Sequence, residues 1–223
     1  MNKTVSEKSL TETEIVVVLD RSGSMGSIER ATVDGFNTFL KEQQGSEGDG
    51  FITLVQFDDR YEVNYKSVPV KEAKDLILHE TFVPRGSTAL LDAIGKTIEE
   101  LKTDRDVVFV IITDGHENAS RTYKHVAITK MVETQEKEHG WKFIFLAANQ
   151  DAIKTGGAMG MSAQNSMTYS ATDRGASAAF VSFSSNVKSY RKGKLDSINL
   201  SDVDLSAVEK SLGFTKEQRD DQK

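Results

Sequence analysis

Residues 15–19 place the strongest limit on how this chain can fold. They form the run Ile-Val-Val-Val-Leu, and the run stops at Asp20, which Ser22 and Ser24 follow at alternate positions. A short, wholly apolar and mostly β-branched segment is typical of a strand that is buried on both faces of a sheet. In an open parallel sheet, ligands bind at the carboxyl ends of such strands. The sequence therefore predicts a buried central strand whose polar end lies in a binding crevice.

Further strands and helices alternate along the chain. Strands are predicted where apolar residues run together or alternate with polar ones, at 51–57, 61–68, 107–113, 141–147 and 167–169. Helices are predicted where apolar residues recur at helical spacing, at 27–44, 71–78, 88–101, 123–139 and 173–192. The alternation at 61–68 indicates an antiparallel edge strand. The predicted fold is α/β: a doubly wound, mostly parallel central sheet with one antiparallel edge hairpin and helices on both faces.

The side chains that follow residues 15–19 suit a particular class of metal ion. Asp20, Ser22 and Ser24 offer one carboxylate and two hydroxyls, which are the hard oxygen ligands that Mg²⁺, Ca²⁺ and Mn²⁺ prefer. The chain has no cysteine, and no paired histidine lies near this segment, which argues against zinc or copper. Taken alone, aspartate and serine ahead of a helix are equally typical of N-cap residues.

Two further segments complete a known pattern. Thr88 lies in Gly-Ser-Thr-Ala-Leu-Leu-Asp at 86–92, at the start of a predicted helix, and Asp114 follows the apolar strand 107–113. Together with Asp-x-Ser-x-Ser at 20–24, these residues resemble the metal-ion-dependent adhesion site (MIDAS) of von Willebrand factor A (VWA) domains. The three pieces occur in the order of that family, and the resemblance extends over about residues 14–192.

The resemblance implies a site as well as a fold. It implies that Asp20 and Asp114 end neighbouring central strands and face one crevice, with Ser22, Ser24 and Thr88 binding Mg²⁺ directly and the two carboxylates acting through water. Mn²⁺ and Ca²⁺ are alternatives to Mg²⁺ at an all-oxygen site. The remaining coordination position accepts a carboxylate from a partner protein, and the Thr88 loop moves as the ligand changes. The compact form resembles stand-alone VWA domains of bacteria and their phages.

Seven residues near the predicted site are candidates for a rim that contacts the partner. They are Arg21, Asp59, Arg60, Arg85, His116, Glu117 and Asn118. Loop residues beside a site are commonly only solvated, so the alternative for residues 116–118 is an ordinary exposed loop. The alternative for residues 58–60 is an ordinary hairpin turn.

Length and charge set the wider context. The 223 residues suffice for a flexible leader at 1–13, a VWA domain at 14–194 and a partly helical C-terminal extension at 195–223 with a frayed end. The net charge of −6 argues against nucleic acid or an anionic membrane as a partner. Neither a run of about 20 apolar residues nor a secretory signal is present, so we expect a cytoplasmic protein, in the host cytoplasm if a phage is the source.

The predicted function is a metal-dependent protein-recognition module that is not an enzyme. One alternative is a metal-dependent phosphatase or hydrolase, because an aspartate at a strand end also opens the site of haloacid-dehalogenase-type phosphatases. In those enzymes a second aspartate follows two residues later, whereas this chain has Ser22 there. Another alternative is a structural or assembly component of a phage or bacterial complex, in which the metal mainly stabilises the domain.

Overall fold

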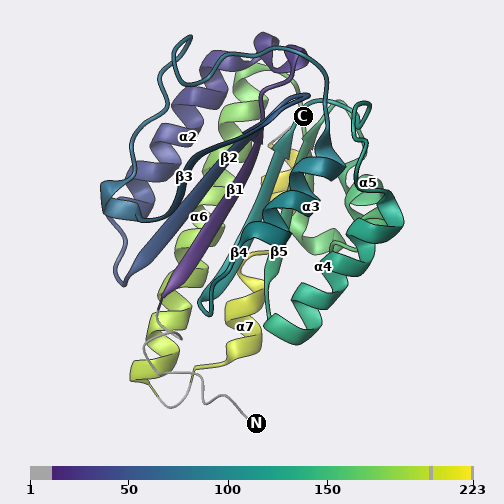
Figure 1. The fold of residues 1–223 in the computed structure, drawn as a ribbon. Helices are drawn as coiled ribbons and strands as arrows, with labels where there is room; N and C mark the ends of the chain where they lie inside the picture. The colour runs from purple at the N-terminus through teal and green to yellow at the C-terminus, as the bar shows by residue number, and fades with distance from the viewer. Residues whose placement is uncertain (1–11, 201–202, 222–223) are drawn as a thin grey trace.

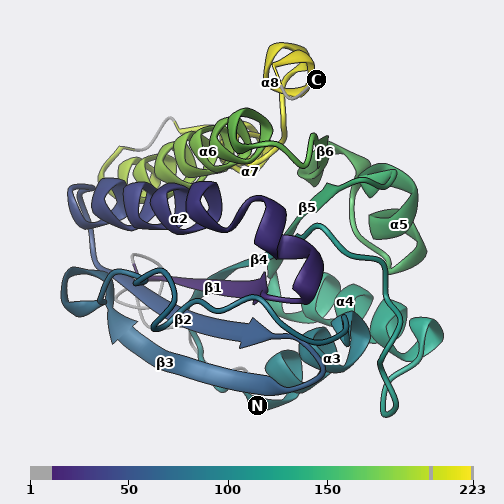
Figure 2. The same ribbon diagram turned by 90° about the horizontal axis from the view of Figure 1, so that it is seen from above.

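A computed structural model describes residues 12–200 and 203–221, so the predicted leader lies almost wholly outside the described residues. Six strands form one sheet in the order β3-β2-β1-β4-β5-β6 (Figure 1 and Figure 2). They are β1 (Thr13–Asp20), β2 (Gly50–Phe57), β3 (Tyr61–Pro69), β4 (Asp106–Thr113), β5 (Lys142–Ala148) and β6 (Ser166–Tyr169). Only the pair β2–β3 is antiparallel among the strands of this sheet in the described chain. The predicted doubly wound sheet with one antiparallel edge hairpin is confirmed.

Helices cover both faces of the sheet, as the view from above shows (Figure 2). One face carries α2 (Glu29–Gln44) and α6 (Asp173–Asn199), and the other carries α3 (Leu90–Glu100), α4 (His125–His139) and α5 (Ala152–Ala158). The shorter helices are η1 (Gly23–Ser27), η2 (Val70–Glu72), η3 (Ala163–Asn165), α7 (Leu205–Lys210) and α8 (Lys216–Asp220), where η denotes a 3-10 helix. None of the helices in the described residues is long and apolar enough to span a membrane.

Strand β1 divides the core into two layers. Ile15, Val17 and Leu19 belong to the hydrophobic cluster under α2 and α6, while Val16 and Val18 belong to the cluster under α3 and α4. All five side chains are fully buried. A strand covered on both faces needs apolar residues at every position, which is why its sequence shows no alternation.

The direction in which the sheet is wound reverses between β1 and β4. The chain leaves β1 through α2 and returns in β2 on one side, whereas it leaves β4 through α4 and returns in β5 on the other. The two strands are parallel neighbours, with Leu19 opposite Ile112. Their carboxyl ends therefore flank the crevice where ligands bind in doubly wound sheets.

The predicted helix at 71–78 is wrong. A single 3-10 turn at Val70–Glu72 is followed by irregular chain. Asn37 of α2 accepts the N–H of Leu76 at 2.8 Å and donates to its carbonyl at 2.9 Å, and Gln44 donates to the carbonyls of Val70 and Ala73. Side chains of α2 thus satisfy the backbone groups that a helix would have paired internally.

The described part of the predicted partly helical extension at 195–223 contains helices. Helix α6 continues to Asn199, and α7 and α8 follow it. Val208, Leu212 and Phe214 are buried in the core cluster of α2 and α6. The Arg219 side chain donates to backbone carbonyls of residues 163, 164 and 166, which lead into β6. The described residues after 202 therefore pack on the domain.

Candidate metal centre

Asp20 lies fully buried at the carboxyl end of β1 with both carboxylate oxygens engaged. Oδ1 accepts the backbone N–H of Ser22 at 2.6 Å, and Oδ2 accepts the hydroxyl of Thr113, at the end of β4, at 2.6 Å. These bonds fix the carboxylate between the two central strands. Burial raises the pKa of Asp20 to about 6, and the hydrogen bonds from Thr113 and Ser22 oppose this shift only in part.

Ser22, Ser24 and Asp114 form a continuous line of oxygens across the crevice. The hydroxyl oxygens of Ser22 and Ser24 are 3.1 Å apart, and Ser24 donates to Oδ1 of Asp114 at 2.6 Å. Oδ2 of Asp114 is buried and has no hydrogen-bond partner among the residues that the structure describes. Burial raises the pKa of Asp114 as well. An unpaired buried carboxylate oxygen is costly unless a cation or a donor satisfies it.

Thr88 joins this group from the loop before α3, and Gly115 makes room for it. A Cβ atom built on Gly115 would lie 2.5 Å from Thr88 Oγ1 and 3.4 Å from both Asp20 Oδ2 and Ser22 Oγ. Three oxygens thus converge on one point, two from the carboxyl end of β1 and one from the loop before α3. Thr88 is held there by Asn118, whose Oδ1 accepts the Thr88 N–H at 2.9 Å and whose N–H donates to the Thr88 carbonyl at 3.0 Å.

The five predicted ligands are therefore brought together, and their chemistry fits a hard divalent cation. Two carboxylates and three hydroxyls supply oxygen donors only, as Mg²⁺ and its relatives require. Within residues 12–200 and 203–221, no group of three or more His, Cys, Asp or Glu side chains gathers as a metal cluster. A cation at this centre would rely on hydroxyls as much as on carboxylates, and it would give Asp114 Oδ2 a partner.

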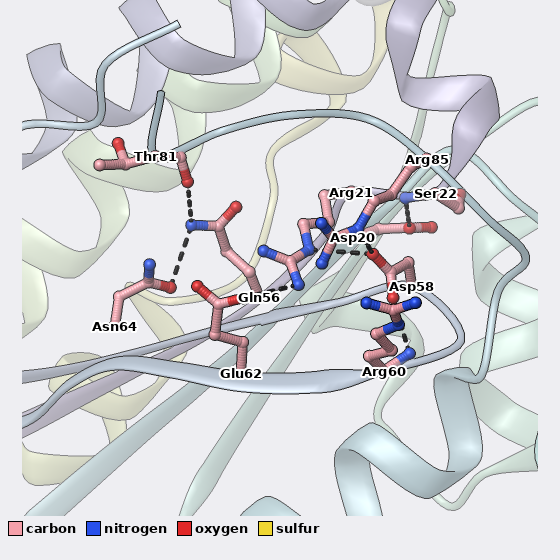
Figure 3. A network of polar contacts seen from close by, with 10 residues as sticks. All are labelled: Asp20, Arg21, Ser22, Gln56, Asp58, Arg60, Glu62, Asn64, Thr81 and Arg85. Atoms are coloured by element: carbon pink, nitrogen blue, oxygen red, sulfur yellow. Dashed lines mark hydrogen bonds and ion pairs between the residues drawn. The ribbon is translucent and has the colours of Figure 1, made fainter. Parts of the chain in front are cut away.

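Arg21 does not form part of an exposed rim. Its side chain is 5% exposed, because it points away from the crevice and pairs with Asp58 at 3.1 Å and with Glu62 at 2.8 Å (Figure 3). Successive residues of an extended segment point to opposite sides, so Asp20 and Ser22 face the site while Arg21 between them faces β2 and β3. The proposal of Arg21 as a rim residue is corrected accordingly.

The other rim candidates divide into two groups. Asp59, Arg60, Arg85, His116 and Asn118 are exposed. Glu117, by contrast, is half-buried and accepts the backbone N–H groups of Leu91, Ala119 and Ser120 and the Ser120 hydroxyl. Together with Asn118, it ties the loop after β4 to the start of α3, so both residues hold the site in shape.

Asp58 has a role that was not predicted from the sequence, since the sequence places it only in the candidate rim turn at 58–60. It is fully buried at the end of β2, where Oδ2 accepts Nε–H of both Arg21 and Arg85, and Oδ1 accepts the Arg60 backbone N–H (Figure 3). Burial acts to raise the pKa of Asp58, but these hydrogen bonds and the two arginine charges hold it below its usual range. A usable signal was present: like Asp20, Asp58 directly follows an apolar strand, so both lie at the same edge of the sheet.

A cleft of about 950 Å³ opens beside Thr88. Its walls are the start of β3, the outer face of α3 and the loop at residues 118–123, and Ser87, Ala89 and Asn118 line its end nearest the site. Arg60, Lys96 and Arg121 bring positive charge to it, and Asp59, Glu99 and Glu100 bring negative charge. A volume of this size accommodates several side chains of a bound segment.

Residues 15–117, slightly less than half of the chain, match the family model of the von Willebrand factor type A domain. The match includes all five predicted ligands. Together with the sheet order, it supports a VWA domain in this chain. No curated protein matches the chain.

Solved structures with the same fold come from distant proteins. Proximal thread matrix protein 1 from the mussel byssus has a TM-score of 0.55 at 15% identity, covering 76% of this chain and 44% of that one. The ArnB paralog VWA2 from Sulfolobus acidocaldarius has a TM-score of 0.51 at 18% identity, with 78% and 44% covered. The pilus adhesin SpaC from Lactobacillus rhamnosus GG has a TM-score of 0.62 at 14% identity, with 80% and 31% covered. The chain thus spans less than half of each, and the likeness concerns the fold.

Proposed function

We propose that this protein is a divalent-metal-dependent protein-recognition module and not an enzyme. Asp20, Ser22, Ser24, Thr88 and Asp114 would hold the cation, with Mg²⁺ as the preferred ion and Mn²⁺ or Ca²⁺ as alternatives. The partner would be a protein that presents an acidic side chain, and neither nucleic acid nor a membrane surface is proposed. We place the protein in the cytoplasm, as a bacterial or phage domain.

One observation carries this proposal. Oxygens of Thr88, Asp20 and Ser22 converge on the space that a side chain on Gly115 would fill, and Asp114 Oδ2 is buried without a hydrogen-bond partner among the described residues. Burial makes both Asp20 and Asp114 resist ionisation, and Oδ2 of Asp114 also lacks a donor among the described residues, which folding alone explains poorly. A cation would relieve both penalties, because it favours the ionised form of each carboxylate and would give Oδ2 a partner.

The residues of the site would have different roles in recognition. A bound cation supplies a Lewis-acidic position for a partner carboxylate. The three hydroxyls are neutral donors, so they would leave most of the cation's charge available to the partner. Thr113 and the Ser22 N–H orient Asp20, and Asn118 orients Thr88, which fixes the geometry before the partner arrives. The cleft beside Thr88 offers room for residues that flank the partner's acidic side chain.

The named relatives are consistent with this proposal. A second structure of the mussel protein has a zinc-occupied MIDAS motif, at a TM-score of 0.52 and 16% identity over 85% of this chain and 46% of that one. SpaC is a pilus adhesin. Both properties belong to those proteins, and we extend to this chain only the idea that a metal mediates attachment.

The decisive experiment compares Thr88→Val with Thr88→Ser. Valine keeps the shape of threonine and removes its hydroxyl, whereas serine keeps the hydroxyl. Both variants should melt within a few degrees of wild type in EDTA, but only Thr88→Val should lose Mg²⁺ binding in calorimetry and partner capture from a lysate of the source cell. Capture by wild type should also vanish in EDTA.

Retention of Mg²⁺ binding and of capture by Thr88→Val would refute the proposed site. The enzymatic alternative is tested with the same proteins. A metal-dependent phosphatase or hydrolase activity that wild type has and Thr88→Val lacks would replace recognition with catalysis as the function of this centre.

A further inference from the structure

The buried carboxylate of Asp58 contacts both loops that carry the hydroxyl ligands. On one side it accepts Nε–H of Arg21, at 3.1 Å, from the loop that holds Ser22 and Ser24. On the other side it accepts Nε–H of Arg85, at 2.9 Å, from the loop that holds Thr88. A carboxylate can accept two arginine donors at once, which a neutral side chain of similar size does less well.

Backbone contacts reinforce the same junction on both sides of Thr88. The N–H of Arg85 donates to the carbonyl of Arg21 at 2.8 Å, and the N–H of Ala89 donates to the carbonyl of Asp58 at 2.9 Å. The N–H of Gly23 donates to the carbonyl of Gly86 at 3.2 Å. Thr88 is therefore bracketed by residues that are fastened to Asp58 and to the loop after β1.

The charges of this junction are balanced within it. Arg21 is buried and bridges Asp58 to Glu62, while the side chain of Arg85 is 44% exposed. Figure 3 shows the side chains of Arg21 and Arg85 meeting at the carboxylate of Asp58. Removing Asp58 would leave the buried Arg21 with Glu62 alone and would free Arg85 from its anchor.

We propose that Asp58 is a positioning residue for the metal centre, which sets the Thr88 loop against the Ser22–Ser24 loop through its shared bonds to Arg21 and Arg85. This inference rests on the proposed function for its consequence, which is metal affinity. Its structural half, the anchoring of residues 85–89, stands without metal and is measurable by itself. Within the described residues, no hydrogen bond joins the Asp58 carboxylate to a proposed ligand side chain, so its effect passes through the two arginines.

The test uses Asp58→Asn and a matched control near the amino-terminal end of β1, whose carboxyl end carries the site. Glu14 is also a fully buried carboxylate, accepting hydrogen bonds from Thr53 and Ser67 and pairing with Arg105 at 3.1 Å. Glu14→Gln therefore disturbs a comparable buried ion pair far from the site. Two quantities are measured on the full chain: amide hydrogen exchange at residues 85–89 in EDTA, and Mg²⁺ affinity by calorimetry.

We expect Asp58→Asn to raise exchange at residues 85–89 by about tenfold or more and to weaken Mg²⁺ affinity by roughly 10- to 100-fold, as loss of a supporting group around a metal typically does. Glu14→Gln should change neither quantity by more than about twofold, even if it lowers the melting temperature as much as Asp58→Asn does. Arg85→Gln, which keeps the Arg21–Asp58 pair, should shift both quantities in the same direction by smaller factors. It serves in place of Asp58→Asn if that variant does not fold.

The inference would be overturned if Asp58→Asn and Arg85→Gln showed the same amide exchange at residues 85–89 and the same Mg²⁺ affinity as Glu14→Gln. A wild-type protein that binds no Mg²⁺ would refute the proposed function, and the exchange rates alone would then decide whether Asp58 anchors the loop. The two failures are thus distinguishable.

Discussion

Ser24 donates a 2.6 Å hydrogen bond to Oδ1 of Asp114, a residue 90 positions later in the chain. The bond joins the loop after β1 to the end of β4 across the crevice. Ser24 is itself exposed, whereas Asp114 is buried. The contact therefore lies at the boundary between the interior and solvent, and a cation placed there would be reachable by a partner.

Asp20→Asn should stabilise the metal-free protein while abolishing its response to metal. At pH 7 the buried carboxylate is ionised although its pKa is raised to about 6. The neutral amide avoids that penalty, on the order of 2–3 kcal/mol at most, and can keep bonds to Ser22 and Thr113. Urea unfolding with and without Mg²⁺ measures both effects. Asp92→Asn is the contrasting control: three backbone N–H groups lower the pKa of Asp92 against the effect of burial, so its neutralisation should destabilise.

The stabilisation by Mg²⁺ should grow as pH rises through about 6. The pKa of Asp20 is higher in the folded state, about 6, than the unfolded value of 3.8, so the folded protein holds this proton to higher pH. The stability of the metal-free protein should therefore fall as pH rises from about 4 to about 6. Mg²⁺ needs the ionised carboxylate, so its effect on the melting temperature should appear over the upper part of that range. The melting temperature is measured with and without Mg²⁺ about one pH unit below and about one unit above 6. A Mg²⁺-induced rise in melting temperature that is equal at the two pH values would contradict this coupling. Asp20→Asn should show no such rise at either pH.

Gly115→Ala should weaken Mg²⁺ binding without unfolding the protein. The added methyl group would lie 2.5 Å from Thr88 Oγ1, so the hydroxyl must move away from the other oxygens. We expect a loss of about tenfold or more in affinity, by analogy with other disturbances of ligand geometry. Gly157→Ala is the matched control, because nothing lies within 4 Å of its added methyl group. It should leave affinity unchanged and stabilise α5 by up to about 1 kcal/mol.

Leu212→Ala should destabilise the domain and leave its metal affinity unchanged. Leu212 is fully buried in the cluster that α2 and α6 share, so its truncation should cost about 2–5 kcal/mol. Leu205 on α7 is 55% exposed, and Leu205→Ala should cost much less. Chemical denaturation compares the two variants. Equal and small losses would mean that the residues after 202 are not part of the folding unit.

The ligands of the proposed centre could be found from sequence because each belongs to a local pattern. Asp20 and Asp114 follow apolar strands, and the resemblance to VWA domains implies that these two strands are neighbours. What holds the ligands could not be read in this way. The bond from Thr113 to Asp20 and those around Asp58 connect segments that are far apart in the chain, and no local periodicity reports such pairings.

Arg21 and Glu117 illustrate the same limit. Both are charged residues in loops, and charged loop residues are mostly exposed. Arg21 is buried only because Asp58 and Glu62 from other strands meet it, and Glu117 is engaged only because the start of α3 presents unpaired N–H groups to it. The failed helix at 71–78 has a similar origin, since Asn37 and Gln44 of α2 bind its backbone.

The reversal of winding between β1 and β4 separates changes at the binding crevice from changes in the packed interior. The chain departs from these strands toward opposite faces, so the crevice is bounded by connecting loops while the sheet and its two clusters lie beneath it. Substitutions at the exposed Asp59, Arg60 and His116 alter what a partner meets without repacking the interior. A lineage can therefore acquire a new binding preference by exchanging these side chains, and the five oxygens beneath them can stay the same.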